Sequence, residues 1–374
     1  MKRPDKKTRI LFINSIQMFG GGEIWMLTAM KALAERGHQI GLICRPKTDL
    51  AERVQTLNYS ISTIPMRGDF DPITIFNFYK KIKSFAPDII LTNMDKELRI
   101  AGLANRFYKK AALIPRRGID YPLKNKFLYK VTYKNWADGI IANSQSTKKS
   151  LLKNAPWLPS EKIRVIYNGI DPKRFEKKSD LLRQELNISK SDFVFGFVGQ
   201  LDERKGLRDL LPAFEVVNSK FKNAKLLLAG EGSLRQEIEN FIKTKQLENS
   251  VFLLGYFENI PEFMANINTL ILPSLWEGFG IVLIEAMASE KSVIATNSSN
   301  LPEIVENGKV GLLVPPQNYK QLADAMTTLI SQPEMSAKMG EAGKKLVEEK
   351  FTLNRMVEEL EQYFYSILDK KKEE

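Results

Sequence analysis

Two residue types that often carry chemistry are almost missing from this sequence. Among 374 residues there is one cysteine, Cys44, and one histidine, His38. A single cysteine excludes a disulfide within the chain and is typical of a reducing compartment. A single histidine argues against histidine-based metal sites and Ser-His-Asp catalysis. Because His38 follows Gly37 at a turn between a helix and a strand, we expect it to have a structural role. Any chemistry must then depend on carboxylates, Arg and Lys side chains and backbone dipoles.

Long apolar segments are also missing. No stretch approaches the ~20 apolar residues that a membrane-spanning helix needs. The segment MKRPDKKTRILFINSIQ starts with a basic group, but its apolar run ends at Asn14, which is too short for a signal peptide. The hydrophobic content of 43% is that of a globular protein with a sizeable core. We therefore expect a cytoplasmic protein.

Acidic residues are scarce in the first half of the chain. The net charge is +12, and residues 1–175 contain 32 Lys and Arg but 14 Asp and Glu, whereas the remainder contains 24 and 30. This asymmetry indicates that the first half meets an anionic partner, which could be nucleic acid, a membrane surface or a phosphorylated substrate. Nucleic acid is disfavoured, because the chain has no recognisable nucleic-acid-binding module and no aromatic stacking platform.

Short apolar strands alternate with helices or loops along the chain. In the first half they are TRILFINS, HQIGLICRP, APDIILTN, AALIPRRG, GIIANS and IRVIYNG, and in the second half FVFGFVGQ, AKLLLAG, SVFLLG, NTLILPS, KSVIAT and GLLVP. This pattern predicts parallel sheets covered on both faces, in an α/β protein with two doubly wound, Rossmann-like domains facing a central cleft. We place the domains at 1–180 and 181–350, with the polar segment 168–192 as a connector. The amphipathic helix in 351–374 is expected to pack back onto the first domain.

A glycine loop follows the first strand, in FGGGEIWML. Gly20 and Gly22 match the start of the dinucleotide fingerprint G-x-G-x-x-G, but Trp25 holds the place of the third glycine. The second strand ends in Cys44 and Arg45, without the acidic residue that binds a ribose in NAD enzymes. The segment therefore indicates a turn suited to phosphate and argues against hydride transfer.

Two glutamates stand in SLWEGFGIVLIEAMAS, residues 274–289. The preceding NINTLILP is predicted to be a buried strand, and a turn at 278–280 leads into a helix that begins near Ile281. Glu277 would lie at the carboxyl end of the strand, where open α/β sheets bind ligands. Glu285 would lie about one turn into an apolar helix, where a carboxylate needs donors such as the hydroxyls of a ligand.

A basic pair precedes these glutamates, in GFVGQLDERKGLRDLLPAF. Arg204 and Lys205 are predicted to lie in a loop after a strand and before a helix. Two cations there can hold a diphosphate, and the helix N-terminus adds backbone N–H groups. Alone, the pair would be better explained as a solvated basic loop, but together with Glu277 and Glu285 it indicates a ligand site.

With AGEGSL, NLPEIVENGKVGLLVPP and VIYNGIDPKRF, these motifs resemble the family 4 glycosyltransferases of GT-B fold over nearly the whole chain. The most specific signature is E-x7-E, from Glu277 to Glu285, in an EGFG…EAMA frame. The resemblance implies transfer of a sugar from a nucleotide-sugar donor to an acceptor hydroxyl, with retention of the anomeric configuration. It also implies that neither a cofactor nor a metal ion is required. Family members with basic first domains commonly build bacterial envelope polysaccharide, lipopolysaccharide or glycolipid.

The resemblance further assigns roles to single residues. Arg204 and Lys205 would neutralise the leaving diphosphate, Glu277 would bind the hydroxyls of the donor sugar, and Glu285 would bind the ribose. Three backbone N–H groups would meet phosphate oxygens, those of Phe279, Gly280 and Ile281. Gly21 and Gly22 would approach the reaction centre from the first domain. Because the departing diphosphate can take the acceptor's proton, no protein base is required, and fixed positive charge would supply most of the catalysis.

One segment departs from the family. Many relatives carry a histidine in the first domain that contacts the donor sugar, and the corresponding segment here is IPRRGIDYP, with Arg116, Arg117 and Asp120. Two interpretations of these residues stay open. They could contact the donor sugar or an anionic acceptor, or the arginines could be surface cations.

Two other functions fit the same fold. A sugar-nucleotide epimerase or hydrolase would be expected to place a histidine and further carboxylates in the cleft, and His38 is badly placed for that. A catalytically dead scaffold would not need the intact set of Glu277, Glu285, Arg204 and Lys205.

The first domain contains two segments suited to a membrane surface. ITIFNFYKKIKSF (73–85) combines apolar and aromatic residues with three lysines, and KNKFLYKVTYKNW (124–136) sets Lys126, Lys130 and Lys134 four apart on one helical stripe. Aromatic residues beside lysines suit a helix in the headgroup region of an anionic bilayer. The alternative is that both are ordinary surface helices with buried apolar faces.

Overall fold

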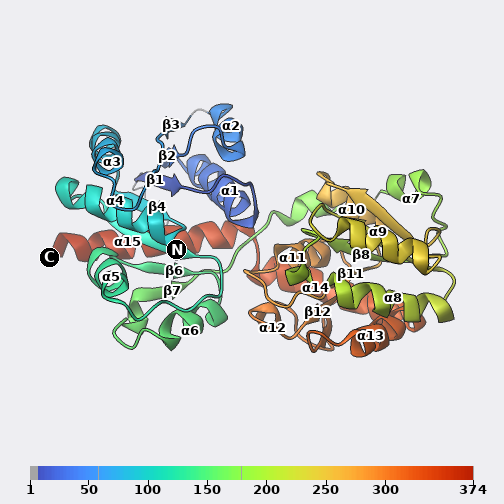
Figure 1. Ribbon diagram of the computed structural model, residues 1–374. Coiled ribbons are helices and arrows are strands. Elements are labelled where there is room, and N and C mark those ends of the chain that lie inside the picture. The colour runs from blue at the N-terminus through green and yellow to red at the C-terminus, as the bar shows by residue number, and fades with distance from the viewer. Residues whose placement is uncertain (1–6, 58, 178, 374) are drawn as a thin grey trace. The chain divides into compact units, whose positions relative to one another are not determined.

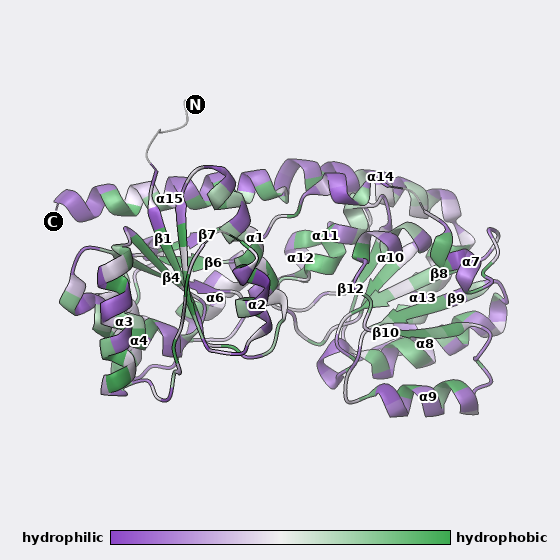
Figure 2. Ribbon diagram, turned by 90° about the horizontal axis from the view of Figure 1, so that it is seen from above, coloured by the Kyte–Doolittle hydropathy of each residue, from purple (hydrophilic) through white to green (hydrophobic). Residues whose placement is uncertain are grey.

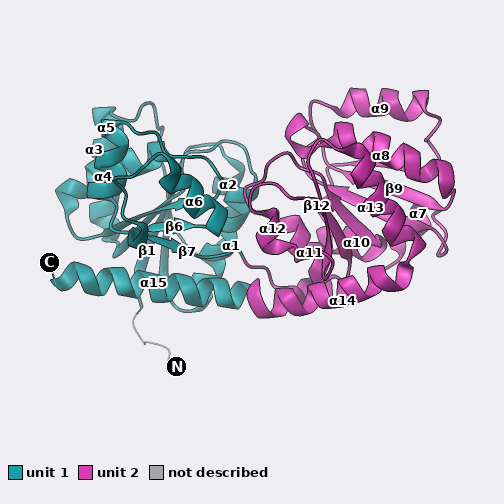
Figure 3. Cartoon of the chain, turned by 90° about the horizontal axis from the view of Figure 1, so that it is seen from below, with its two compact units in different colours: residues 1–168, 353–374 teal, residues 169–352 magenta. Residues whose placement is uncertain are grey.

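The computed structural model describes residues 7–57, 59–177 and 179–373, which leaves most of the basic start of the chain outside the described residues. The chain forms two compact units (Figure 3): unit 1 spans residues 1–168 and 353–374, and unit 2 spans residues 169–352. Each unit is a parallel sheet with helices packed on both faces, as Figure 1 shows. The predicted fold class is therefore confirmed for each unit.

The described residues of unit 1 form a seven-stranded sheet in the order β3-β2-β1-β4-β5-β6-β7. Its strands are β1 (Arg9–Asn14), β2 (Gln39–Cys44), β3 (Ser60–Thr63), β4 (Ile89–Thr92), β5 (Ala112–Arg117), β6 (Ile140–Ala142) and β7 (Ile163–Val165). Its helices are α1 (Gly21–Glu35), α2 (Asp49–Gln55), α3 (Pro72–Phe85), α4 (Asp95–Tyr108), α5 (Phe127–Tyr129), the π-helix η1 (Lys130–Trp136), α6 (Gln145–Lys153), the short η2 (Ser160–Lys162) and α15 (Leu353–Glu373).

The described residues of unit 2 form a six-stranded sheet in the order β10-β9-β8-β11-β12-β13. Its strands are β8 (Phe193–Val198), β9 (Ala224–Ala229), β10 (Val251–Gly255), β11 (Thr269–Leu272), β12 (Ser292–Thr296) and β13 (Gly311–Val314). Its helices are η3 (Pro172–Phe175), α7 (Leu181–Glu185), η4 (Glu203–Lys205), α8 (Leu207–Lys220), α9 (Arg235–Thr244), α10 (Ile260–Asn266), α11 (Ile281–Ala288), α12 (Leu301–Ile304), α13 (Tyr319–Ser331) and α14 (Pro333–Lys350).

The strands are apolar on both faces because helices cover both faces. In β1, Ile10 and Phe12 belong to the core on one face, with residues of α1 and α15. Leu11 and Ile13 belong to the core on the other face, with residues of α3 and α4. Figure 2 shows the hydrophobic strands inside each unit and the mixed colouring of the helices around them.

The last helix, α15, belongs to unit 1. Its apolar stripe is buried in the core that also contains residues of α1, through Met356, Leu360 and Phe364. The Tyr363 hydroxyl donates a hydrogen bond to the Lys162 carbonyl at 2.9 Å, and it accepts one from the Ile140 N–H at 3.0 Å. These bonds join the helix to β6 and to the end of η2, directly before β7.

The boundary between the units lies at 168/169, not at 180/181 as the polar composition of 168–192 suggested. The Ile170 N–H donates to the Phe351 carbonyl at 3.0 Å, which ties this segment to the end of α14. Four apolar side chains of the segment are buried in unit 2, those of Ile170, Phe175, Leu182 and Ile188, whereas Leu181 is exposed. Composition hid the boundary, because three or four well-spaced apolar residues are enough to anchor a polar segment.

Three local features differ from the sequence prediction. The chain forms an additional edge strand, β3, whose SIST sequence is only half-buried. Helix α1 already begins at Gly21, so Gly21 and Gly22 lie in its first turn rather than in a loop. The helix predicted in 124–136 is a short α5 followed by the π-helix η1. Separately, none of the helices in the described residues is both long enough and apolar enough to span a bilayer.

Candidate active site

The strand order of unit 2 reverses between its two central strands, β8 and β11. β9 and β10 extend the sheet on one side of this pair, and β12 and β13 extend it on the other. Ligands of open α/β sheets bind at the carboxyl ends of the strands at such a reversal. The loop with Arg204 and Lys205 follows β8, and the loop with Glu277 follows β11. The two sequence motifs therefore meet at the position where a ligand is expected.

Backbone contacts hold these two loops together. Gly206 has φ +69°, and a Cβ there would lie 2.0 Å from the Pro273 carbonyl oxygen, so this position requires glycine. The Leu275 N–H donates to the Arg204 carbonyl at 2.8 Å. Within the first loop, the Asp202 carboxylate accepts a hydrogen bond from the Lys205 N–H at 3.2 Å. The positions of both cations are thus set by the backbone around them.

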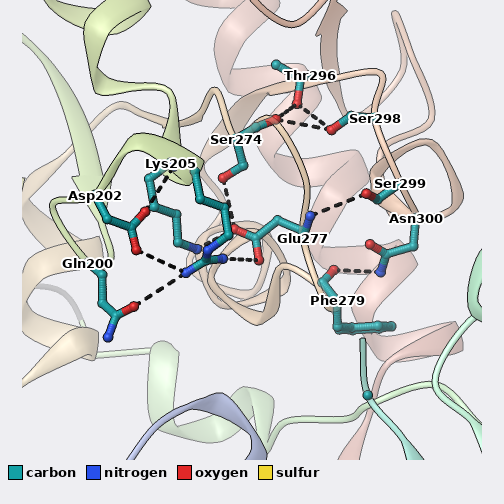
Figure 4. Close-up of polar contacts among 12 residues, drawn as sticks. Gln200, Asp202, Lys205, Ser274, Glu277, Phe279, Thr296, Ser298, Ser299 and Asn300 are labelled. Atoms are coloured by element: carbon teal, nitrogen blue, oxygen red, sulfur yellow. Dashed lines mark hydrogen bonds and ion pairs between the residues drawn. The ribbon is translucent and has the colours of Figure 1, made fainter. Parts of the chain in front are cut away.

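The carboxylate of Glu277 is the centre of the polar contacts in Figure 4. Its Oε1 accepts hydrogen bonds from Lys205 Nζ and, at 2.9 Å, from Ser274 Oγ. Its Oε2 lies 3.8 Å from Arg204 Nη1. Only 8% of the Glu277 side chain is exposed, and a carboxylate buried to this degree needs such partners.

Arg204 is held by its own set of neighbours. Its guanidinium lies 4.9 Å from the centre of the Trp276 ring, within cation–π range. Nη2 donates to Gln200 Oε1 at 3.4 Å and lies 3.6 Å from Asp202 Oδ2. The exposed fraction of its side chain is 23%, against 12% for Lys205. Both cations are partly buried, so water screens their charges less than it would at the surface.

The turn after Glu277 leads directly into α11, which begins at Ile281 as predicted. The Phe279 carbonyl accepts a hydrogen bond from Asn300 Nδ2 at 3.0 Å, and the Phe279 ring packs against Phe351 with 6.1 Å between the ring centres. Gly280 is the N-cap of the helix. The first N–H groups of a helix have no partner within the helix and carry its positive dipole end.

Glu285 lies one turn into α11 and differs from Glu277. Burial raises the pKa of its carboxyl to about 7, and the charge of Arg174 in η3 opposes that shift. Within the described part of the chain, the Glu285 carboxylate makes no hydrogen bond and lies within 4 Å of no cationic group. A half-buried carboxylate without a protein partner is suited to accept hydrogen bonds from a ligand.

In unit 1, the two arginines of IPRRGIDYP are not surface cations, so that interpretation is wrong. Arg116 is 3% exposed, and its guanidinium stacks 3.8 Å from the centre of the Trp25 ring. Arg117 forms an ion pair with Asp95 at 2.8 Å and donates to the Tyr133 hydroxyl at 3.3 Å. Asp120, in the loop after β5, accepts a hydrogen bond from Ser146 Oγ at 2.6 Å.

Sequence reasoning missed Glu97, a buried carboxylate at the corresponding edge of the unit 1 sheet. It accepts hydrogen bonds from the Ser15 N–H and hydroxyl and from the N–H groups of Asn93 and Met94, at 2.6–3.0 Å. Burial raises its pKa to about 7, although these bonds oppose the shift. Its place in the first turn of a helix directly after a strand, where carboxylates cap N–H groups, was the available signal.

His38 has the structural role expected of it. Its Nδ1 lies 2.7 Å from Thr8 Oγ1, and its Nε2 lies 2.9 Å from Glu361 Oε1 on α15. Elsewhere in the described residues, no group of three or more His, Cys, Asp and Glu side chains is placed to hold a metal ion.

Two family models match the chain. The model described as glycosyl transferases group 1 matches residues 178–346, and the one described as glycosyltransferase family 4 matches residues 19–174. The capsular polysaccharide biosynthesis glycosyltransferase CapM of Staphylococcus aureus is 29% identical over 348 residues, which cover 86% of this chain and 89% of that protein.

Two further proteins are similar over almost the whole chain. The UDP-Gal:alpha-D-GlcNAc-diphosphoundecaprenol alpha-1,3-galactosyltransferase of Escherichia coli is 24% identical, over 93% of this chain and 94% of its own. The structure of Anabaena HepE in complex with UDP superposes with a TM-score of 0.84 at 22% identity, covering 96% of this chain and 100% of that one. This likeness shows the GT-B fold. With both family models matched and the E-x7-E residues in place at the strand reversal, this chain belongs to the family 4 glycosyltransferases.

Proposed function

We propose that this protein transfers a sugar, with retention, from a nucleoside-diphosphate sugar to a hydroxyl of a glycan or glycolipid in bacterial envelope polysaccharide synthesis. The observation that carries the proposal is the placement of Arg204 and Lys205 beside Glu277 at the strand reversal of unit 2. The names of the S. aureus and E. coli relatives support a polysaccharide or lipid-linked acceptor. The complex of HepE supports a uridine nucleotide in the donor.

Charge on the leaving group is the main catalytic requirement of this reaction. The bond from the anomeric carbon to the diphosphate oxygen breaks, and a bond from that carbon to the acceptor oxygen forms. Arg204 and Lys205 stabilise the charge that develops on the diphosphate, and the N–H groups of Gly280 and Ile281 at the start of α11 add to it. In a retaining reaction the acceptor approaches on the side of the departing diphosphate, whose oxygen takes the acceptor's proton.

Glu277 is arranged to bind a sugar while it positions a cation. Its Oε1 is used by Lys205 and Ser274, whereas its Oε2 has Arg204 at 3.8 Å as its neighbour among the described side chains. Oε2 therefore keeps the capacity to accept hydrogen bonds from sugar hydroxyls. Glu285, whose carboxylate has no partner among the described residues, is the candidate for the ribose hydroxyls.

Activity should not require a divalent cation, because the fixed charges of Arg204 and Lys205 supply the neutralisation that a metal ion supplies in other enzymes. We expect the full chain to release nucleoside diphosphate from one donor in a panel of UDP-, GDP- and ADP-sugars, and to do so faster with a diphospholipid-linked N-acetylglucosamine acceptor. EDTA should leave the rate unchanged. Release would be followed by a coupled nucleotide assay, and the product by mass spectrometry.

Two outcomes would contradict these statements. Conversion of the donor to a different nucleotide sugar, or to free sugar at a rate that the acceptor does not change, would identify the epimerase or hydrolase alternative. Activity abolished by EDTA and restored by a divalent ion would overturn metal independence. His38 does not support the epimerase or hydrolase alternative, because both of its ring nitrogens are hydrogen-bonded, to Thr8 and to Glu361.

We further propose that unit 1 docks on an anionic membrane through one stripe of α3 and the end of α4. Ile73, Phe76 and Tyr79 are three apart on α3, and Phe107 of α4 lies 6.1 Å from the Tyr79 ring centre. Ile73, Phe76 and Phe107 are all more than half exposed, and Lys80 lies over the Phe76 ring. Exposed aromatic residues flanked by lysines suit the headgroup region.

The structure also limits this surface. Phe78 and Ile82 of α3 belong to the core of unit 1 rather than to the surface. In the second segment Tyr133 is buried, and Phe127 is its one exposed apolar side chain among the described residues. The docking surface is therefore confined to α3, Phe107 and the lysines beside them.

Replacing Lys80, Lys81 and Lys83 with glutamine should weaken binding to phosphatidylglycerol vesicles about a hundredfold, because each lysine near such a surface contributes about 1 kcal/mol. Vesicle co-sedimentation at low and high salt measures the affinity for the vesicles, which should fall as the salt concentration rises. The matched control replaces Lys222, Lys225 and Lys243 of unit 2. No binding to anionic vesicles at low ionic strength, or an equal effect of the control, would contradict the proposal.

A further inference from the structure

Three side chains of unit 1 lie at one level of its sheet, where its strand order reverses. β1 and β4 pair Ile13 with Thr92, and β4 and β5 pair Thr92 with Pro115. The next residue along each strand is therefore at the same height: Asn14, Asn93 and Arg116. Because side chains alternate along a strand, all three point to the face that Phe12, Leu91 and Ile114 share with α1.

Arg116 is a buried cation without a carboxylate at contact distance. In the described part of the chain, its guanidinium makes one hydrogen bond, from Nη2 to Asn168 Oδ1 at 2.9 Å, and no Asp or Glu oxygen lies within 4 Å. Burial lowers its pKa to about 9, and the more distant Glu23 opposes that shift. Burying a cation is costly unless it is paired. The four other N–H donors of the guanidinium remain for a ligand.

Residues close to Arg116 leave room for its guanidinium and stack on it. A Cβ at position 118 would lie 2.6 Å from Arg116 Nη1, so Gly118 leaves the space that the guanidinium occupies. The Trp25 ring of α1 lies under the guanidinium, with 3.8 Å between the guanidinium carbon and the ring centre. The planar group is thus stacked on an aromatic ring and occupies a space that glycine at position 118 leaves open.

Asn93, beside Arg116 on the next strand, is the second unusual group. Its Oδ1 and its Nδ2 are both enclosed, and neither has a hydrogen-bond partner among the described residues. By contrast, Asn14 on the other side donates to Glu23 Oε1 at 2.9 Å. A buried amide with both ends unpaired costs free energy that a polar ligand would recover.

Arg117, the next residue of the same strand, has a structural role and serves as a comparison. It points to the opposite face and is paired with Asp95. Arg116 has no such partner among the described carboxylates, although it is the more deeply buried of the two. The two arginines therefore have different roles.

We propose that Arg116 and Asn93 form a binding site in unit 1 for an anionic group of the acceptor, a phosphate or a carboxylate, with Asn93 binding an adjacent hydroxyl. The assignment to the acceptor rests on the proposed function, in which unit 2 binds the nucleotide donor. The chemistry of the site, a fixed planar cation beside a free amide, selects an oxyanion attached to a polar body. The excess of basic residues in the first half of the chain favours the approach of such a ligand.

The test uses the full chain with Arg204→Ala and Lys205→Ala, so that the cations of unit 2 do not bind the probes. Three probes share one sugar: glucose 1-phosphate, methyl glucuronide and methyl glucoside. Calorimetry measures their dissociation constants, and Trp25 emission reports contact with the guanidinium. We expect one of the two anions to bind at least tenfold more tightly than the neutral glucoside and to change the emission. The preferred anion identifies the group as phosphate or carboxylate.

Three variants distinguish a ligand site from a structural cation. Arg116→Gln should weaken binding of the preferred anion at least tenfold, whereas Arg106→Gln, an exposed arginine of the same unit, should not. Asn93→Ala, which keeps the charge, should weaken binding of all three probes by a similar factor. Trp25→Phe should remove the emission change but leave the calorimetric signal.

Equal anion affinity in the Arg116→Gln and Arg106→Gln variants would overturn the proposal, and so would a lowered melting temperature of Arg116→Gln with unchanged affinity. Because the background lacks the unit 2 cations, these results do not depend on sugar transfer. If the wild-type chain transferred no sugar but still bound the anion at Arg116, only the proposed function would be refuted.

Discussion

Replacing Lys205 or Arg204 with alanine is expected to lower kcat about a hundredfold, with the fold intact. Each change removes a fixed charge from the leaving diphosphate, and catalytic contacts of this kind are worth about 3 kcal/mol. The effect should appear in kcat rather than in the affinity for the acceptor, because the charge matters most when the bond to the diphosphate breaks. Steady-state release of nucleoside diphosphate measures it, with circular dichroism as the test of folding.

Arg208 provides a matched control for these variants. It lies at the start of α8, 55% exposed, and pairs with Glu203 at 3.0 Å and Glu237 at 2.9 Å. Exposed ion pairs contribute little, so Arg208→Ala should keep its kcat within about a factor of two. Wild-type kcat in a folded Arg204→Ala variant would overturn the assignment of the basic pair.

A double variant of Lys205 and Glu277 tests whether Glu277 positions the lysine. Because Glu277 contacts both Lys205 and Arg204, removing it also disturbs the cations. The loss in kcat of a Lys205→Ala, Glu277→Ala double variant should therefore be smaller than the product of the two single losses. Strictly multiplicative losses would show that Glu277 acts on the sugar without positioning the lysine.

Replacing Glu285 with alanine is expected to weaken the binding of free nucleoside diphosphate tenfold to about a hundredfold, while Glu277→Ala spares most of that affinity and impairs use of the sugar donor. Hydrogen bonds to a charged group are worth about 1.5–3 kcal/mol. In the part of the chain that the structure describes, no side chain is bonded to the Glu285 carboxylate and so none is placed to replace it at the ribose. Calorimetric titration of both variants with the nucleoside diphosphate separates the two roles. Equal losses in the two variants would refute this division.

The raised pKa of Glu285, about 7, gives this prediction a pH dependence. Ribose hydroxyls donate hydrogen bonds to the ionised carboxylate, so affinity in the wild type should rise between pH 6 and pH 8. Glu285→Gln should lack this increase and retain only the pH dependence of the nucleotide itself. A wild type and a Glu285→Gln variant with the same pH profile would contradict the role of the carboxylate.

The contribution of Glu285 to folding stability should depend on pH in the opposite sense to its contribution to nucleotide affinity. The folded state raises this pKa above its ordinary value of 4.5, so it favours the protonated form. The contribution of Glu285 to stability is therefore greatest below about pH 4.5 and declines as the pH rises towards 7. At pH 8 the Glu285→Gln variant should unfold no more easily than the wild type, so that lost nucleotide affinity cannot be attributed to unfolding.

Much of unit 2 and its site was predictable, because local chemistry determines it. The apolar run of β11, the glycine-containing turn and the uninterrupted helix-forming segment after it predicted that α11 begins at Ile281, as it does. The alternation of parallel strands and helices then requires loops to emerge at one edge of the sheet. That rule was enough to expect the loop of Arg204 and Lys205 near Glu277.

The partners of each side chain depended on the tertiary structure. Glu277 and Lys205 are both visible in the sequence, but their loops are joined by tertiary contacts, the close approach of Gly206 to the Pro273 carbonyl and the hydrogen bond from the Leu275 N–H to the Arg204 carbonyl. The boundary at 168/169 was hidden, because the hydrogen bond from Ile170 to Phe351 joins residues that are far apart along the chain.

Arg116 and Arg117 show most clearly that the sequence does not reveal the partners of a side chain. By sequence alone, two adjacent arginines at the end of a strand are equivalent, and both a ligand role and a solvated role fitted them. The alternation of side chains across the sheet sends one towards Trp25 and Asn168 and the other towards Asp95. Short-range order and composition thus determined the elements and the edge of the sheet where a ligand binds. Which charges are paired and which remain available to a ligand was decided by neighbours that only folding brings together, because an electrostatic partner is set by distance in space and not along the chain.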